Sequence, residues 1–311
     1  MPEAMADTPT FQSPPISPDL DTGDHDDGLA AFAPVRPRLF GIAYRMLGSA
    51  AEAEDIVQDA WLRWQCANRR AVENPAAFLA TTTTRLCINH LQSARSRHET
   101  YVGTWLPEPV DTSGDPRLGA ERSEALKLAV LLLLEKLNPT ERAAYVLREA
   151  FDYSYRQIAD ILQLEEANSR QLVSRARKYV ADSRRAPVSS DEQRRFLEVF
   201  IGAAQNGDMT QLERLFAEDV VSYADGGGIV RAARVPVAGR ERVAKFIAAF
   251  SSHFWKGVTL SRINTNGQAS ILMSRNGEPS GLVTIDVSEQ GIDQIIWIMR
   301  PSKLSAIAKP A

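Results

Sequence analysis

The sequence predicts a multidomain protein in which two all-α modules are followed by an α+β domain. Apolar residues recur at intervals of three and four over most of residues 36–182, which is the periodicity of amphipathic helices. Past Pro187, apolar runs alternate with Asn-Gly and Gly-containing turns, which is typical of an antiparallel sheet. A chain of 311 residues, 44% apolar and 24% charged, is long enough for this arrangement.

Residues 1–33 form an acidic tail. They contain seven Asp or Glu residues, five prolines and no Lys or Arg, so the rest of a chain whose net charge is −3 carries +4. Such a segment buries too little apolar surface to offset its ordering entropy, and we expect it to be disordered. Two roles fit it: keeping the chain soluble, or mimicking nucleic acid to shield a basic surface.

The composition favours a cytoplasmic protein without a cofactor or metal. The N-terminus lacks the pattern of a signal peptide, and apolar runs such as 129–134 are far shorter than the roughly 18 residues that span a bilayer. Cys66 and Cys87 lack any ligand spacing, and we expect both to be small buried hydrophobic residues.

The first helical module, residues 34–99, contains three predicted helices. One runs from Arg36 to a stop at Gly48, and Ser49 with Glu52 forms a capping box for the next, 51–64. That second helix has an acidic face, which is either a solvated surface or a docking site for a basic partner. The third helix, 75–98, has no acidic residue after Arg85 and suits a polyanion through its cations and amides: Arg85, Asn89, Gln92, Arg95 and Arg97.

The second helical module, residues 120–185, ends in the pattern of a helix-turn-helix. We expect helices over 121–137 and 140–150, and then two short helices, the first capped by Ser154 and Gln157. The last helix presents polar side chains on one face with cations beside it, as base edges and phosphates require: Asn168, Arg170, Gln171, Arg175, Arg177 and Lys178. An ordinary helical hairpin with a solvated basic face is the alternative.

The C-terminal domain, residues 186–311, is predicted as a curved sheet wrapped round helices into a cone. The expected helices are 192–205, 209–217 and 240–253, and the expected strands are 220–224, 258–265, 269–274, 281–287 and 292–299. Three glycines follow Asp225. Because a strand-like run, 229–237, comes after them in place of a helix, they indicate a tight turn that another segment can approach closely rather than a phosphate loop.

Together these segments resemble an RNA polymerase sigma factor of the extracytoplasmic-function (ECF) class. RLFGIAYRMLGSAAEAEDIVQDAWLRW and AFLATTTTRLCINHLQSARSR resemble sigma-70 region 2, and LNPTERAAYVLREAFDYSYRQIADIL with RQLVSRARKYV resembles region 4. The linker motif WLPEP, the DGGG motif and RPSKL, close to NPDKL, resemble a subgroup with a fused SnoaL-like domain of the NTF2-like cone fold. In that subgroup the fused domain replaces a separate anti-sigma factor.

The resemblance implies partners and site residues. Asp55, Gln58 and Asp59 would dock on the β′ clamp helices of core RNA polymerase, whose β subunit is a further partner. The segment 81–97 would hold and melt the downstream promoter element, and the upstream element would be contacted in the major groove by Arg170, Gln171, Ser174 and Arg175. A regulatory interface between the linker, residues 100–119, and the C-terminal domain would involve Trp105, Leu106, Pro107, Asp225, Gly226, Gly227, Gly228, Lys303 and Leu304.

Three residues depart from the family pattern. Gln163 stands in place of a glycine, Glu165 in place of a small N-capping residue, and Ser169 in place of an aliphatic residue. Gln163 must then adopt a positive φ, and the Ser169 hydroxyl falls on the buried face. A buried hydroxyl without a partner costs about 1 to 3 kcal/mol, so we expect a looser hairpin than in relatives.

Two further functions fit parts of the sequence. A helix-turn-helix regulator would bind promoter duplex without polymerase, with the C-terminal domain sensing a small-molecule ligand. A cyclase-like enzyme would need a general base in an apolar cavity, and the candidates Tyr223, Asp225, His253 and Asp286 are not clustered in the sequence. We expect no enzymatic activity.

Overall fold

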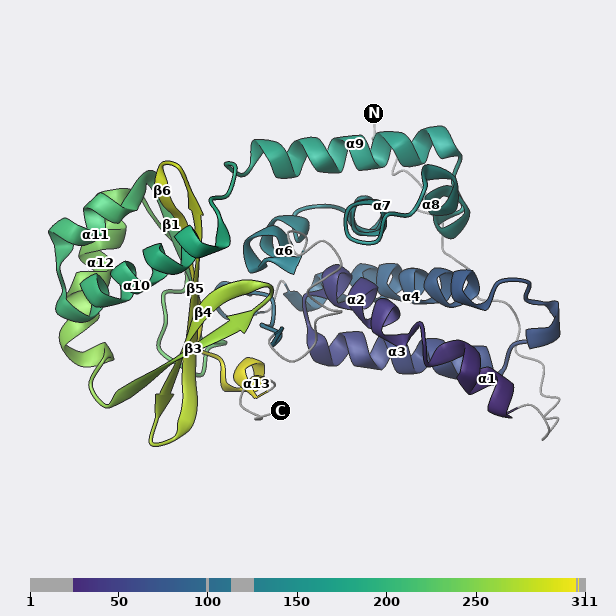
Figure 1. The fold of residues 1–311 in the computed structure, drawn as a ribbon, viewed down its shortest axis with the longest axis horizontal. Coiled ribbons are helices and arrows are strands. Elements are labelled where there is room, and N and C mark those ends of the chain that lie inside the picture. The colour runs from purple at the N-terminus through teal and green to yellow at the C-terminus, as the bar shows by residue number, and fades with distance from the viewer. Residues whose placement is uncertain (1–24, 99–100, 113–125, 306, 308–311) are drawn as a thin grey trace, which may run out of the picture.

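The computed structural model describes residues 25–98, 101–112, 126–305 and 307 (Figure 1). The helices before residue 186 are α1 His25–Phe32, α2 Arg36–Leu47, α3 Ala50–Gln65, the 3-10 helix η1 Arg69–Ala71, α4 Pro75–His98, α6 Leu128–Leu134, α7 Pro139–Glu149, α8 Tyr155–Leu162 and α9 Glu166–Asp182. The later elements are α10 Ser190–Asn206, α11 Met209–Leu215, β1 Phe216–Asp225, β2 Val237–Ala238, α12 Arg240–Phe254, β3 Val258–Thr265, β4 Gln268–Arg275, β5 Glu278–Ser288, β6 Gly291–Ile298 and α13 Pro301–Leu304. None of the described helices is long and apolar enough to cross a bilayer.

The two helical modules are packed together in one hydrophobic core. Helices α7 and α8 lie against α2 and α4, and buried side chains from both modules form a single cluster. Polar contacts reinforce this packing, since Arg142 in α7 donates to the Met46 carbonyl at 2.6 Å and Arg38 in α2 donates to the Phe151 carbonyl at 2.8 Å. We call this packing of α7 and α8 on α2 and α4 the closed arrangement.

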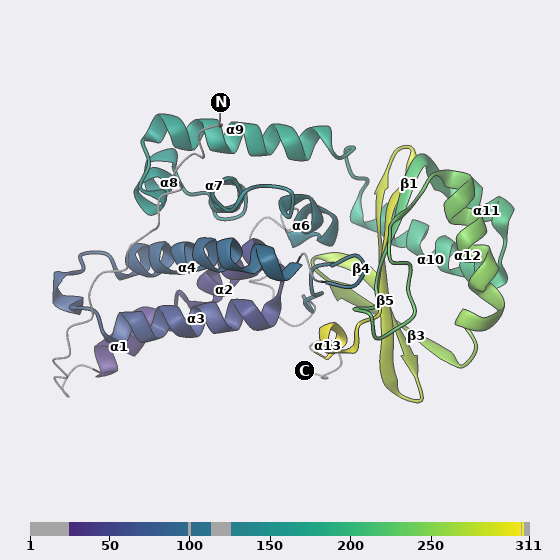
Figure 2. The ribbon, with the colours of Figure 1, turned by 180° about the vertical axis from the view of Figure 1, so that it is seen from behind.

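The C-terminal domain has one six-stranded sheet in the order β2-β1-β6-β5-β4-β3. Strands β3 to β6 form the predicted antiparallel meander. Strand β1 pairs with β6 in parallel orientation. Helices α10, α11 and α12 cover one face, while the other face is turned toward the helical half (Figures 1 and 2).

The strands β5 and β6 are buried on both faces. Val283 and Trp297 join the core beneath α10 and α12, whereas Leu282, Ile296 and Ile298, which alternate with them, join the core of the helical modules. Successive side chains of a strand point to opposite faces, so one pair of strands borders both cores. This explains why apolar residues follow one another directly at 282–283 in β5 and at 295–298 in β6.

The predicted disorder of residues 1–33 is wrong for the part that the structure describes. Residues 25–32 form α1, in which Phe32 is buried against Trp61 at 4.8 Å between ring centroids. Trp64 also donates through its indole N–H to the Gly28 carbonyl at 2.9 Å. The apolar end of this segment therefore packs on α3. The disorder was predicted from the composition of residues 1–33 as a whole, in which the acidic residues and prolines outweigh this apolar end. Residues 1–24 lie outside the described residues.

Three smaller predictions also need correction. The helix expected over 121–137 is α-helical only at 128–134, with 121–125 outside the described residues. The run 229–236 is not a strand, because left-handed Gly227 and Gly228 turn the chain and only Val237–Ala238 pairs with β1. Cys66 is exposed because it is the C-cap of α3, whereas Cys87 is buried as expected.

Candidate functional site

One candidate surface is the acidic face of α3. Ser49 caps the helix by accepting a hydrogen bond from the Glu52 backbone N–H at 3.3 Å, as its sequence predicts. Asp55, Gln58 and Asp59 are all exposed. Leu62, 53% exposed, extends the same face by one turn, and sequence reasoning missed it because helical periodicity does not separate an exposed leucine from a core one. The face therefore offers charge and an apolar contact to a partner.

The predicted polyanion-binding face of α4 is partly covered by the second module. The Arg85 Nε donates to the Ile161 carbonyl of α8 at 3.1 Å, and this burial lowers the pKa of Arg85. Asn89 is half-buried and Gln92 is exposed. Arg95 and Arg97 lie in the last turns of α4, but the predictions for their side chains fall outside what the structure describes.

Helices α8 and α9 form the predicted helix-turn-helix. The capping box of Ser154 and Gln157 is complete, with the Ser154 hydroxyl accepting from the Gln157 backbone at 3.2 Å. Gln163 adopts φ 56° at the C-cap of α8, and Glu165 at the N-cap of α9 makes no side-chain capping bond. The Ser169 hydroxyl is fully buried and has no hydrogen-bond partner among the described residues. The positive φ and the buried hydroxyl are as the sequence predicts, and the looser hairpin stays a prediction.

The outward face of α9 carries the predicted DNA-contacting side chains. Its members are all exposed: Asn168, Arg170, Gln171, Ser174, Arg175, Arg177 and Lys178. Several of the cations pair within the chain, because Arg175 contacts Glu141 at 3.1 Å and Arg177 contacts Glu149 at 2.6 Å. Exposed pairs of this kind are worth about 0 to 1 kcal/mol, so phosphates can displace them.

The predicted regulatory interface is assembled round Asp225 at the end of β1. Its fully buried carboxylate accepts from the Tyr101 hydroxyl at 2.6 Å, the Leu106 backbone N–H at 3.2 Å and the Lys303 ammonium at 2.8 Å. Lys303 also donates to the Leu106 carbonyl and lies 4.5 Å from the centre of the Trp105 ring. The linker motif, the DGGG motif and the C-terminal motif thus meet at one buried ion pair.

Burial sets the electrostatics of this interface. Desolvation lowers the pKa of Lys303, and the charge of Asp225 counteracts it. Desolvation and the hydrogen bond to Asp225 raise the pKa of Tyr101 to about 12. Arg300 donates to the Tyr101 hydroxyl at 3.1 Å. Sequence reasoning missed Tyr101, which lies outside the WLPEP motif, and Arg300, which is a residue of RPSKL that departs from NPDKL.

The glycines allow the close approach that the sequence indicates. A side chain at Gly226 would place its Cβ 2.2 Å from the Val230 carbonyl, and one at Gly227, where φ is 58°, would lie 2.7 Å from the Arg300 side chain. Both distances are shorter than van der Waals contact. Leu106, Pro107 and Leu304 are buried or half-buried beside them, so the WLPEP motif is packed rather than exposed.

The linker also binds the first helical module through Glu108. Its carboxylate accepts from the Ala50 backbone N–H at the start of α3 at 2.7 Å, and its backbone N–H donates to the Gly48 carbonyl at 2.7 Å. The Tyr44 hydroxyl of α2 donates to the Glu108 carbonyl at 2.5 Å. Glu108 therefore satisfies an unpaired helix N-terminus from another segment.

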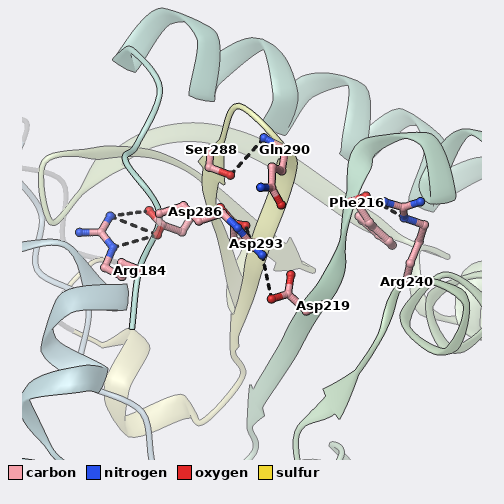
Figure 3. A network of polar contacts seen from close by, with 9 residues as sticks. Arg184, Phe216, Asp219, Arg240, Asp286, Ser288, Gln290 and Asp293 are labelled. Atoms are coloured by element: carbon pink, nitrogen blue, oxygen red, sulfur yellow. Dashed lines mark hydrogen bonds and ion pairs between the residues drawn. The ribbon is translucent and has the colours of Figure 1, made fainter. Parts of the chain in front are cut away.

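A second set of ion pairs joins the end of α9 to the sheet (Figure 3). Arg184 contacts both carboxylate oxygens of Asp286 on β5, at 3.0 and 3.1 Å, and both side chains are 8% exposed. Arg185 next to it pairs with Asp219 at 2.9 Å and with Asp293. The hydrogen bond from Arg185 lowers the pKa of Asp219. These contacts fix the direction in which the chain enters the C-terminal domain.

The candidate general bases do not converge on one cavity. Asp225 is engaged by Tyr101 and Lys303, Asp286 is paired with Arg184, and His253 is exposed. The space between helices and sheet holds aromatic rings, with Phe200 and Phe254 at 6.0 and 5.7 Å from Trp297. No group of three residues able to hold a metal occurs among the described residues.

Comparison with known proteins defines the class of the helical modules. The sigma-70 region 2 family model matches residues 31–97, and the sigma-70 region 4 family model matches residues 127–180. A helix-turn-helix with an exposed polar and basic face, preceded by a region 2 module, is the architecture of a sigma-70-type transcription factor.

The relatives identify the family within that class. The ECF RNA polymerase sigma factor SigJ of Mycobacterium tuberculosis is 37% identical over 236 residues, which are 74% of this chain and 75% of the relative. The probable ECF RNA polymerase sigma factor SigI of the same species is 31% identical over 288 residues, 91% and 97% of the two chains. The chain belongs to the family of ECF RNA polymerase sigma factors.

The whole fold also matches a solved structure. The crystal structure of the M. tuberculosis extracytoplasmic function sigma factor SigJ aligns with a TM-score of 0.72 at 30% identity, covering 89% of this chain and 98% of that one. The fold class is therefore two helical sigma modules followed by a SnoaL-like α+β domain, as the sequence predicts. The domain boundaries at 33, 99, 119 and 185 stay predictions.

Proposed function

We propose that this protein is an alternative sigma factor, which binds core RNA polymerase in the cytoplasm and directs it to a promoter. The observation that carries the proposal is the match of two sigma-70 family models, in chain order, to modules whose α3 and α9 faces are exposed. No chemistry is required of the protein itself, because strand opening comes from binding melted DNA more tightly than duplex.

Each surface has its own role in this proposal. Asp55, Gln58 and Asp59 on α3 dock on the β′ clamp helices, and α4 holds the melted downstream element. The outward face of α9 contacts the upstream element as duplex, with polar side chains toward bases and arginines toward phosphates. Arg85 is half-buried and bonded to the Ile161 carbonyl, so we expect it to bind the melted downstream element only after the closed arrangement opens.

The C-terminal domain regulates this activity through its contacts with the linker. Support comes from the Asp225–Lys303 ion pair, which ties β1 and α13 to the linker at Leu106. A small-molecule ligand would fit a depression of about 290 Å³ between the linker and the DGGG turn, lined by Val102, Gly228, Arg231 and Arg234 among others. Two arginines there favour an anionic ligand.

Run-off transcription with purified core polymerase tests the proposal. We expect a promoter-specific transcript that requires this protein, with a different yield from a chain shortened within residues 186–311. Core polymerase without a sigma factor is the control. If neither the full chain nor any shortened chain directs a specific transcript, the protein is not a sigma factor.

A further inference from the structure

The turn between β3 and β4 carries Asn266, a residue outside every predicted site. Asn266 and Gly267 form a two-residue hairpin turn with φ of 54° and 72°, the backbone that favours Asn-Gly. Such turns ordinarily face solvent, as the exposed Asn276–Gly277 turn between β4 and β5 does. Asn266, by contrast, is fully buried.

The side chain of Asn266 joins three parts of the molecule. Its Oδ1 accepts from the Val110 backbone N–H of the linker at 3.0 Å. Its Nδ2 donates to the Tyr44 hydroxyl of α2 at 2.7 Å and to the Leu126 carbonyl, just before α6, at 2.9 Å. Its backbone N–H donates to the Val110 carbonyl at 3.0 Å. A residue of the C-terminal domain thus binds the linker and both helical modules at once.

The neighbouring contacts align the linker with this hairpin. The Thr112 backbone N–H donates to the Asn264 carbonyl at 3.1 Å, and the Gly267 N–H donates to the Thr112 hydroxyl at 3.1 Å. Only an asparagine combines an acceptor, two donors and tolerance of a left-handed backbone in so short a side chain. An aspartate has the shape but not the donors.

We propose that Asn266 is the latch that holds the two helical modules in the closed arrangement. In that arrangement the Arg85 Nε is bonded to the Ile161 carbonyl, so separation of the modules would free Arg85 on α4 for promoter DNA. The consequence for transcription rests on the proposed function, whereas the latch itself does not.

The test compares two matched substitutions in the full chain. Asn266→Gly keeps the turn and the backbone N–H but removes the amide, and Asn266→Asp places a carboxylate against the Leu126 carbonyl. Asn276→Gly makes the same change in the exposed turn and serves as the control. Spin labels on the exposed Cys66 of the first module and on Ala181→Cys in α9, in a Cys87→Ala background, report the distance between the modules.

The loss of three side-chain hydrogen bonds in Asn266→Gly, and of the two that the amide donates in Asn266→Asp, should each enlarge the separated, longer-distance population about tenfold or more. Asn276→Gly should match the parent. If the distance distribution of both Asn266 variants is the same as that of the parent protein, Asn266 does not hold the modules together and the proposal is wrong. Unfolding midpoints are measured in parallel.

Run-off transcription separates the latch from the function. Variants that open should yield more transcript per protein than the parent, and an opened variant with the parent's yield would refute the regulatory half of the proposal. Open variants in a protein that gives no transcript in any form would instead leave the latch standing and reject the sigma function.

Discussion

Ser169 and Gln163 are the two residues of the helix-turn-helix whose environment follows most directly from their sequence positions. Helical spacing places the Ser169 hydroxyl on the buried face, and the structure confirms it as buried and unpaired among the described residues. Gln163 takes the left-handed conformation that a glycine adopts at no steric cost. We expect both residues to lower the stability of the hairpin without altering the exposed face of α9.

Replacement of Ser169 by alanine should stabilise the protein. The change removes the desolvation cost of an unpaired hydroxyl and leaves little cavity, so we expect a gain of about 1 kcal/mol in the free energy of unfolding. Denaturant unfolding measures it. Ser174→Ala, on the exposed face of the same helix, should change the free energy by less than about 0.5 kcal/mol. A loss of stability in Ser169→Ala would mean that the hydroxyl has a partner.

Tyr101 gives the linker contact a defined pH dependence. Its pKa is raised from 10.0 to about 12, because it is desolvated and donates to the Asp225 carboxylate. The folded protein therefore holds this proton more tightly than the unfolded chain. The stabilisation is complete below pH 10 and is lost as the pH rises through about 12.

A spectrophotometric titration of tyrosine ionisation checks this dependence. The difference between the parent and Tyr101→Phe should be a single phenol that ionises near pH 12. A difference curve centred near pH 10 would show that Tyr101 is not held by Asp225. Comparison with Tyr179→Phe, an exposed tyrosine on α9, gives the reference curve.

Among the elements, the helix starts at Ser49 and Ser154 were predicted from the sequence, and the interfaces between helices were not. Ser49, Asn138 and Ser154 each cap the helix that follows, since a side-chain oxygen three residues before a backbone N–H is a local signal. The contact between Arg85 and α8 joins residues that are 76 positions apart in the chain. A local sequence pattern therefore cannot predict it. The same reason explains why α1 was missed.

Charge reversal on α3 should abolish polymerase binding. Asp55→Arg combined with Asp59→Arg places two cations on a face proposed to meet a basic partner, and we expect association to weaken about a hundredfold or more. Affinity for core polymerase and the circular dichroism spectrum are the measurements. Glu278→Arg with Glu289→Arg, two exposed residues of the C-terminal domain, makes the same charge change and should leave binding intact. Unchanged association of the α3 variant would reject this docking face.

At the scale of the whole molecule, the sequence predicted the domains but not how they are joined. Motif positions indicated that the linker and the DGGG turn would meet, and they do, at Asp225. Asn266 and Glu108 escaped prediction because their importance comes from partners far away in the chain. Burial of β5 and β6 on both faces was not predicted either, because the second core belongs to helices far away in the chain.

Breaking the Arg184–Asp286 pair should destabilise the junction between α9 and the sheet. Arg184→Met removes the cation that contacts both oxygens of the buried Asp286 carboxylate, and we expect a loss of about 3 to 5 kcal/mol in the free energy of unfolding. Arg194→Met breaks the exposed pair with Asp191 and should cost no more than about 1 kcal/mol. Equal effects of the two substitutions in denaturant unfolding would show that Arg184 and Asp286 are not buried in solution.

The two strands that border both cores limit how this protein can be switched on. Complete departure of the C-terminal domain would wet Leu282, Ile296, Ile298 and Leu304, at about 1.5 to 3 kcal/mol for each side chain. The total cost of exposing these four side chains is larger than the stabilisation expected from the Asn266 amide and the Asp225–Lys303 ion pair. Activation should therefore proceed either as a hinge that keeps the sheet seated on one module, or with another apolar surface taking its place.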